Sequence, residues 1–189
     1  MSHLGAGLLT RHHAKPNGSF VIFKSDISRA YHLLPMYPLW QIKQVVTVDG
    51  ERDIDCNNCF GGQGLAGIFI SFNRLVTWIA RKEKSVPDLW SYMDDSFSID
   101  EYRNITWYPC YEKNMPANQV KLLSLWDKLG IPHEPHKQVF GNRLMIIGIE
   151  VNANSLTLML PAQRLHDLLQ ELCKFTAWTT EKRGTTQTL

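Results

Sequence analysis

The sequence predicts an α+β domain with the β-α-β-β-α-β order of a ferredoxin-like split unit. Two observations lead to this prediction: strand-like and helix-like patterns alternate in that order, and carboxylates stand at the ends of two of the strands. In this topology the first and third strands are antiparallel neighbours. We therefore expect Asp26, which ends the first strand, to lie beside Asp94 and Asp95. The six elements are expected at 20–25, 65–82, 88–93, 96–100, 116–129 and about 137–147.

Length and composition indicate one globular domain. The chain has 189 residues, of which 44% are hydrophobic and 20% charged. The net charge of +2 neither requires nor excludes a nucleic-acid partner. Four scattered cysteines do not form a secreted disulfide framework, and no apolar run reaches the roughly 20 residues of a membrane span. We expect an intracellular protein of the cytoplasm or nucleus, without a signal peptide or membrane partner. Its oligomeric state is left open.

No helix or strand is expected before the strand at 20–25. Residues 1–19 show no sustained period, which predicts a disordered or partly ordered lead-in. The strand at 20–25 follows. Pro35 and Pro38 then limit the chain after Asp26 to a short helical turn, because proline interrupts helix hydrogen bonding.

A β-hairpin and an amphipathic helix come next. Asp49-Gly50 is a strong two-residue hairpin signal, which pairs residues 41–48 with 51–59. From residue 65 the apolar positions repeat at i, i+3, i+4 and i+7, which predicts a helix over 65–82. Asn73 and Thr77 are expected to lie away from its buried stripe, where they could serve a ligand. The predicted buried stripe is Leu65, Ile68, Phe69, Phe72, Leu75, Val76 and Ile79.

The last third of the chain is expected to hold two helices and short strands. No element is predicted for 101–115, whereas 116–129 is a helix that ends before Gly130 and Pro132. Strands are expected at Val139-Phe140, across 144–151 and at 155–160. A last helix begins after Pro161 and spans 161–178 with Leu165, Leu168, Leu169 and Leu172 inward, and 179–189 is expected to fray.

The three carboxylates at strand ends predict a cation site. Like charges in close proximity repel unless protons or cations neutralise them. Oxygen ligands suit magnesium, and phosphoryl-transfer enzymes hold this ion with carboxylates. Asp26, Asp94 and Asp95 are therefore candidate magnesium ligands.

Five segments, in order, resemble the palm of reverse transcriptases. Tyr92-Met93-Asp94-Asp95 looks like the catalytic tetrapeptide of that family, and residues 26–31 resemble its first motif. Residues 60–69 resemble the second motif, Lys137 the lysine of a later motif, and Ile147-Gly148 the primer grip. The wording of residues 24–31 is closest to retrotransposons of the DIRS-like, tyrosine-recombinase group. The resemblance covers roughly residues 20–175.

The resemblance implies an RNA-directed DNA polymerase that transfers nucleotides to a primer 3′-hydroxyl with two Mg²⁺ ions. Its partners would be an RNA or DNA template with primer, and deoxynucleoside triphosphates. Residues 20–160 would form the palm with a β-hairpin insertion, and 161–178 would start a thumb. The catalytic residues would be Asp26, Asp94, Asp95 and Lys137, with the three aspartates as metal ligands.

The resemblance also implies a nucleotide site and a primer or template site. Main-chain N–H groups of residues 27–31 would hold triphosphate oxygens, and Tyr31 would exclude a ribose 2′-hydroxyl. Lys137 would donate a proton to pyrophosphate. The nucleotide-binding residues would be Ile27, Ser28, Arg29, Ala30, Tyr31, Gly61, Gly62 and Gln63. The primer or template residues would be Tyr92, Met93, Ile147 and Gly148.

Two alternatives stay open. The chain has only 25 residues before Asp26 and one helix that could begin a thumb, which is typical of a truncated, inactive retroelement remnant that at most binds nucleic acid. An RNA-dependent RNA polymerase palm is the other alternative. Tyr31 argues against it, since a small or acidic residue is expected there.

Overall fold

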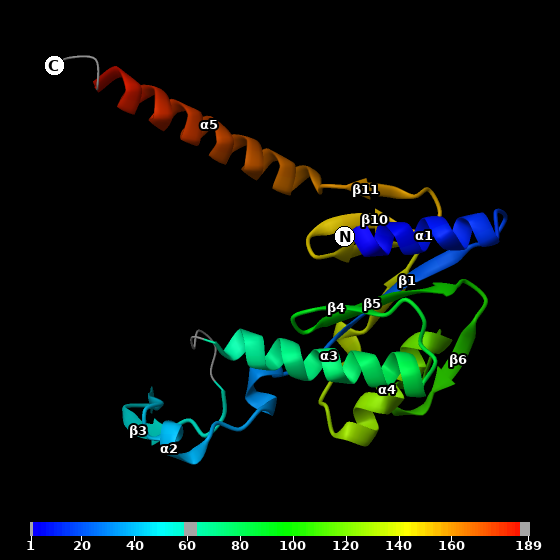
Figure 1. Cartoon of the computed structure of the whole chain (residues 1–189), viewed down its shortest axis with the longest axis horizontal. Helices are drawn as coiled ribbons and strands as arrows, with labels where there is room; N and C mark the ends of the chain where they lie inside the picture. Colours follow the sequence, from blue (N-terminus) through cyan, green and yellow to red (C-terminus); the bar gives the residue numbers. More distant parts are fainter. Residues whose placement is uncertain (1, 59–63, 186–189) are drawn as a thin grey trace.

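The protein is an α+β fold built on antiparallel sheets, in a computed structural model that describes residues 2–58 and 64–185. Its central sheet has four strands in the order β4-β5-β1-β8, with α3 and α4 on one face and α1 on the other (Figure 1). The α-helices are α1 Ser2–Ala14, α2 Pro38–Gln41, α3 Leu65–Glu83, α4 Ala117–Leu129 and α5 Ala162–Thr185. The 3-10 helices are η1 Ala30–Leu33, η2 Pro109–Tyr111 and η3 Pro135–Lys137. The strands are β1 Phe20–Asp26, β2 Val45–Val48, β3 Glu51–Ile54, β4 Trp90–Tyr92, β5 Asp95–Glu101, β6 Ile105–Tyr108, β7 Lys113–Pro116, β8 Val139–Gly141, β9 Arg143–Ile146, β10 Ile149–Asn152 and β11 Thr157–Met159.

The central sheet follows the element order that the sequence predicts. Along the chain the elements β1, α3, β4, β5, α4 and β8 succeed one another, and β1 and β5 are antiparallel neighbours. Their ladder runs from the pair Phe20 and Glu101 to the pair Asp26 and Asp95. The sequence therefore placed the carboxylates at the correct end of the correct strand pair.

Both faces of this sheet bury apolar side chains, since alternate strand residues point to opposite sides. Phe23 belongs to the core beneath α3 and α4, together with the fully buried Trp126. Phe20 and Ile22 belong to a second core, between the sheet, α1 and the β9–β10 pair. The sheet is thus fixed from both sides, which holds the ends of its strands in place.

The prediction of a disordered or partly ordered lead-in at 1–19 differs from the structure, which has α1 over residues 2–14. Leu4 and Leu8, one helical turn apart, are buried against Phe20 and its neighbours in the second core. A Cβ at Gly7 would come within 2.7 Å of the Trp90 ring, so the helix docks closely. Leu4 and Leu8 stand among glycines, and one repeat of apolar residues is too short a pattern to predict a helix from the sequence.

The buried face of α3 is rotated from the predicted one. Ile68 and Leu75 are 54% and 57% exposed, whereas Asn73 and Thr77 are buried. The helix packs against β4 and η1 with a face that carries polar groups. Apolar periodicity located the helix but not its buried face, where Asn73 bonds the Met93 carbonyl of the β4–β5 turn.

Two other segments differ from the sequence prediction. Within 101–115, where no element was predicted, β6 and β7 pair antiparallel around η2. The single strand expected across 144–151 is two strands, because Ile147 and Gly148 have positive φ and turn the chain. The predicted hairpin at Asp49-Gly50 is present as β2 and β3.

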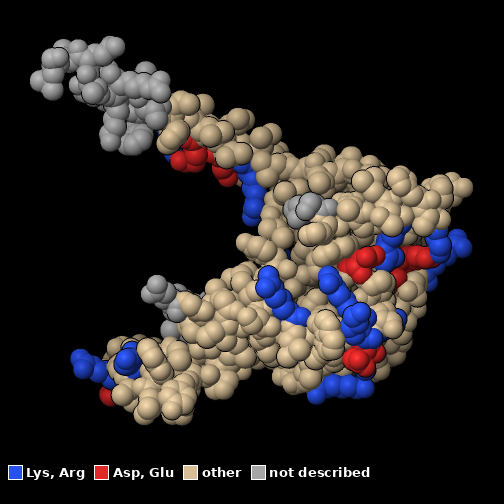
Figure 2. Space-filling view, viewed as in Figure 1, with Lys and Arg blue, Asp and Glu red and all other residues tan. Residues whose placement is uncertain are grey.

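Helix α5 extends away from the body, at the top left of Figure 1. Its leucines, predicted to point inward, are about half exposed, and the helix continues to Thr185 where fraying was expected from 179. Residues 186–189 lie outside the described part. The β2–β3 hairpin projects on the same side, and a broad hollow opens between the two projections (Figure 2). In the described ranges, no helix combines the length and apolarity that crossing a bilayer requires.

Candidate active site

Three carboxylates meet at one end of the β1–β5 ladder. Asp26 is the last residue of β1 and pairs with Asp95, the first residue of β5. Asp94 precedes Asp95 in the β4–β5 turn, and its carbonyl accepts a 3.2 Å hydrogen bond from the N–H of Ile27. The predicted convergence of residues from distant parts of the chain is confirmed.

The β4–β5 turn is tight and is held from α3. Met93 has a left-handed backbone with φ of 53°, which reverses the chain within two residues. Its carbonyl accepts a 2.6 Å hydrogen bond from the buried Asn73 side chain. Tyr92, next to this turn, is 56% exposed, so its side chain is accessible to a ligand. A recess of about 190 Å³ lies between the turn and α3.

Lysines neutralise two of the three carboxylates. Lys137 Nζ lies 3.0 Å from Asp26 Oδ1. Lys24 Nζ lies 3.2 Å from Asp95 Oδ1 and donates a hydrogen bond to Oδ2 at 3.4 Å. Lys24 is a residue of this site that is not among those predicted from the sequence. The signal was present, since residues two apart on a strand share a face and Lys24 is two before Asp26.

Burial and charge shift two of these groups. Burial raises the pKa of Asp95, because a carboxylate is less stable away from water, and Lys24 opposes this shift. Asp94 and Asp26 repel its charge and add to the increase. The hydrogen bond to Asp26 raises the pKa of Lys137. The site therefore concentrates negative charge that positive groups must balance.

The residues suit a divalent cation in their chemistry. Asp95 Oδ1 is buried and accepts no hydrogen bond, although Lys24 Nζ lies 3.2 Å away in an ion pair, and carboxylate oxygens are the ligands that Mg²⁺ prefers. However, no three His, Cys, Asp or Glu residues in the described ranges are gathered closely enough to enclose a metal ion. Lys24 and Lys137 each pair with one of these carboxylates, and the magnesium site stays a prediction.

The predicted nucleotide residues are only partly available. The N–H groups of Ile27 and Ser28 are already bonded, to the carbonyls of Asp94 and Pro132, so they do not form the expected open nest. Ile27 and Ala30 are buried, and Arg29 is left-handed with φ of 58°. Gly61, Gly62 and Gln63 lie outside the described residues.

Tyr31 contacts the core instead of standing free. Its ring lies 5.3 Å from that of Phe69, measured between centroids, and it packs against the core under α3. Ile147 and Gly148 form the turn between β9 and β10, which belong to a different sheet from β1 and β5. Their predicted contact with a primer stays a prediction.

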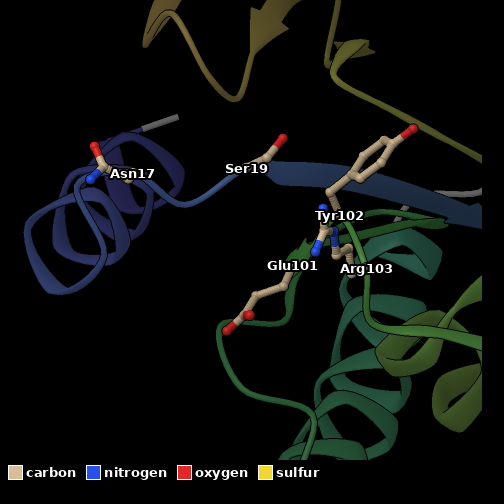
Figure 3. Close-up of a pocket in the computed structure, with 5 residues that line it drawn as sticks. All are labelled: Asn17, Ser19, Glu101, Tyr102 and Arg103. Atoms are coloured by element: carbon tan, nitrogen blue, oxygen red, sulfur yellow. The ribbon is translucent and has the colours of Figure 1, made fainter.

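A larger recess lies at the opposite end of the β1–β5 ladder. It measures about 430 Å³ and is lined by Asn17, Ser19, Glu101, Tyr102 and Arg103 (Figure 3). Glu101 and Phe20 form the first of the seven residue pairs of this ladder, and Asp26 and Asp95 form the last. This recess is therefore separate from the carboxylates, and its size does not mark the chemical site.

Comparison with solved structures relates the fold to reverse transcriptases. No family model matches the sequence, and no curated protein matches it. The fold is similar to that of the foamy viral protease-reverse transcriptase dRH in complex with double-stranded DNA, with a TM-score of 0.56 and 12% identity over 77% of this chain and 23% of that chain. Two further foamy viral protease-reverse transcriptase structures, with an RNA/DNA hybrid and with double-stranded DNA, each have a TM-score of 0.55 and 13% identity over 76% of this chain. They are matched over 17% and 27% of their own lengths, so this chain spans about a quarter or less of each structure. About three quarters of the chain has a reverse-transcriptase-like fold.

Proposed function

We propose that this chain is the palm of a reverse transcriptase, an RNA-directed DNA polymerase that extends a primer 3′-hydroxyl. One observation carries the proposal: Asp26, Asp94 and Asp95 meet at one end of the β1–β5 ladder. The similar fold of solved reverse transcriptases supports it. The chain spans a small part of those proteins, so the activity of a whole polymerase is itself part of the proposal.

Asp26, Asp94 and Asp95 would hold two Mg²⁺ ions, which would activate the primer hydroxyl and stabilise charge on the transferred phosphoryl group. Lys137 holds a proton on Nζ beside Asp26 and would supply it to the leaving pyrophosphate. For this, Lys137 must release Asp26. Lys24 would remain paired with Asp95. Its positive charge offsets part of the cost of burying the Asp95 carboxylate.

A template with its primer would lie in the hollow between α5 and the β2–β3 hairpin. The β4–β5 turn points to the same side of the molecule (Figure 1), so a strand in this hollow would lie on the side that carries this turn. Tyr92, Met93, Ile147 and Gly148 would contact it, and α5 would begin the thumb. We propose DIRS-like retrotransposons as its source, because the wording of residues 24–31 is closest to that group.

One observation favours a second candidate, a remnant that binds nucleic acid without polymerising. Lysines pair with Asp26 and Asp95, and no three acidic or other metal-binding side chains in the described part enclose a metal ion. In such a remnant the three aspartates would keep their place in the fold without catalysing nucleotide transfer. The two candidates share the nucleic-acid surface and differ in catalysis.

Primer extension separates them. The purified chain is incubated with poly(rA)·oligo(dT), dTTP and Mg²⁺, next to Asp94→Asn, and Glu101→Gln at the far end of β5 serves as the control. We expect extension by the native chain and the control, and a loss of at least about 100-fold with Asp94→Asn, because the metals lose a ligand. Primer–template binding by fluorescence anisotropy is measured in parallel. Binding without extension by the native chain would support the remnant and contradict the polymerase.

A further inference from the structure

Four buried acceptor oxygens without a hydrogen bond lie near the candidate active site. Besides Asp95 Oδ1 they are Asn73 Oδ1, Gln119 Oε1 and Gln138 Oε1, in three amide side chains that are at most 2% exposed. Buried polar atoms are nearly always paired in folded proteins, so such a group calls for an explanation.

Each amide donates a hydrogen bond to a main-chain carbonyl at the end of β1 or in the β4–β5 turn. Asn73 of α3 donates to the Met93 carbonyl, one peptide before Asp94, at 2.6 Å. Gln138, between η3 and β8, donates to the carbonyl of Asp26 itself at 3.1 Å. Gln119 of α4 donates to the Lys24 carbonyl at 3.3 Å and to Ser25 Oγ at 3.1 Å.

These contacts fix the orientation of the amides. A carbonyl can only accept, so the amide nitrogen must face it, and a flipped amide would set oxygen against oxygen. Gln138 is fixed twice, since it also donates to the Glu134 carbonyl at 3.2 Å. Because each nitrogen must face its carbonyl, the amide oxygen points away from these partners and stays unpaired. An unpaired buried acceptor lowers the stability of the folded protein at each of the three positions.

We propose that Asn73, Gln119 and Gln138 are positioning residues that hold the main chain on both sides of the carboxylates in one geometry. They come from α3, from α4 and from the link between η3 and β8, and they converge on the end of β1 and on the β4–β5 turn. The Ile27 N–H bond to Asp94, at 3.2 Å, joins these two segments and is the contact that the amides protect. The purpose of this arrangement rests on the proposed function, whereas the arrangement itself can be tested without it.

The experiment measures amide hydrogen exchange by NMR in Asn73→Leu and Gln138→Met. Both variants keep the approximate side-chain volume and remove the donor. The matched control is Gln44→Met, since Gln44 also donates to two carbonyls, of Asp55 and Asn57, each at 3.0 Å, but beside the β2–β3 hairpin. The readout is the exchange rate of Ile27 divided by that of Ile22 in the middle of β1, which cancels any general loss of stability.

We expect this ratio to rise roughly tenfold or more in both variants and to change less than about twofold in the control, because only local opening is affected. A ratio unchanged in a folded Gln138→Met or Asn73→Leu protein would overturn the proposal. Either variant suffices if the other does not fold.

Titration with free Mn²⁺, followed by electron paramagnetic resonance, tests the proposed function separately. If the native chain binds Mn²⁺ and Asp94→Asn does not, the positioning variants should bind it roughly 10–100-fold more weakly. If the native chain binds no Mn²⁺ while the exchange ratio still rises, the positioning role is supported and the polymerase proposal fails.

Discussion

The two ends of the β1–β5 ladder use similar polar residues but satisfy them differently. At the Phe20 end, Asn154 uses its whole amide, with Oδ1 accepting from Phe20 N–H at 2.8 Å and Nδ2 donating to the Phe20 carbonyl at 3.1 Å. Asp100 is 2% exposed and accepts three hydrogen bonds, from Glu101, Asn104 and Asn118. At this end the buried polar groups are paired with each other.

At the Asp26 end the pairing is incomplete. Asp95 Oδ1 accepts no hydrogen bond, and three amide side chains leave their oxygens unpaired. A buried polar group that only supports the fold is expected to be satisfied, as Asp100 is. The unpaired amide oxygens belong to side chains whose nitrogens bond the main chain beside the aspartates, and Asp95 Oδ1 lies 3.2 Å from Lys24 Nζ without a hydrogen bond. The recess of about 430 Å³ at the satisfied end shows that hollow space alone does not identify a site.

The largest effect is expected for Asp100→Ala at the satisfied end. The change removes the acceptor of three hydrogen bonds, one of them from the N–H of Asn118 in the first turn of α4. We expect a loss of about 2–4 kcal/mol in the free energy of unfolding, because buried donors are left unpaired. Urea denaturation followed by circular dichroism measures it, with Asp100→Asn as the milder control. A loss below about 1 kcal/mol would mean that the two ends do not differ as described.

A smaller effect of opposite sign is expected for Asp95→Asn. The pKa of Asp95 is raised above 3.8 in the folded protein, so the native state binds this proton more tightly than the unfolded chain does. Stability in the native chain therefore falls as the pH rises through the folded pKa. We expect the variant to be more stable at pH 7 by about 0.5–2 kcal/mol, as is common when functional strain is removed.

The same measurement at a series of lower pH values tests the cause. The gain should shrink as the pH approaches 3.8, the unfolded value, because the native carboxyl then becomes protonated as well. A gain that is independent of pH would show that the ionisation of Asp95 is not its cause, whereas no gain or a loss of stability at pH 7 would show that Lys24 compensates the burial of Asp95 in full.

The smallest effect is expected for Lys137→Met. Its ion pair with Asp26 is partly exposed, with 35% and 21% of the two side chains accessible, and such pairs contribute about 0–1 kcal/mol. The pKa of Lys137 is raised above 10.5, so its contribution is present below that pH and is lost as the pH rises through the folded pKa. Thermal unfolding at pH 7 should differ by only about 1–4 °C. A larger loss would make Lys137 a structural residue of the Asp26 end.

The sequence by itself determined the order of the central elements and the position of the acids. Strand and helix periods are local, and the topology then brought Asp26 next to Asp95 although they are far apart in the chain. The hairpin at Asp49-Gly50 was equally local, since two residues with positive φ specify the turn.

Only the tertiary structure decided which side chains hold the Asp26 end of the β1–β5 ladder in place. Nothing local shows that Leu4 and Leu8 dock a helix on the sheet, that Asn73 faces inward, or that Gln138 bonds the Asp26 carbonyl. The partner of a buried polar atom is set by elements distant in sequence, and apolar periodicity carries no information about it. The sequence thus located the carboxylates, whereas their neutralisation by lysines and the fixing of their main chain by amides arise from long-range packing.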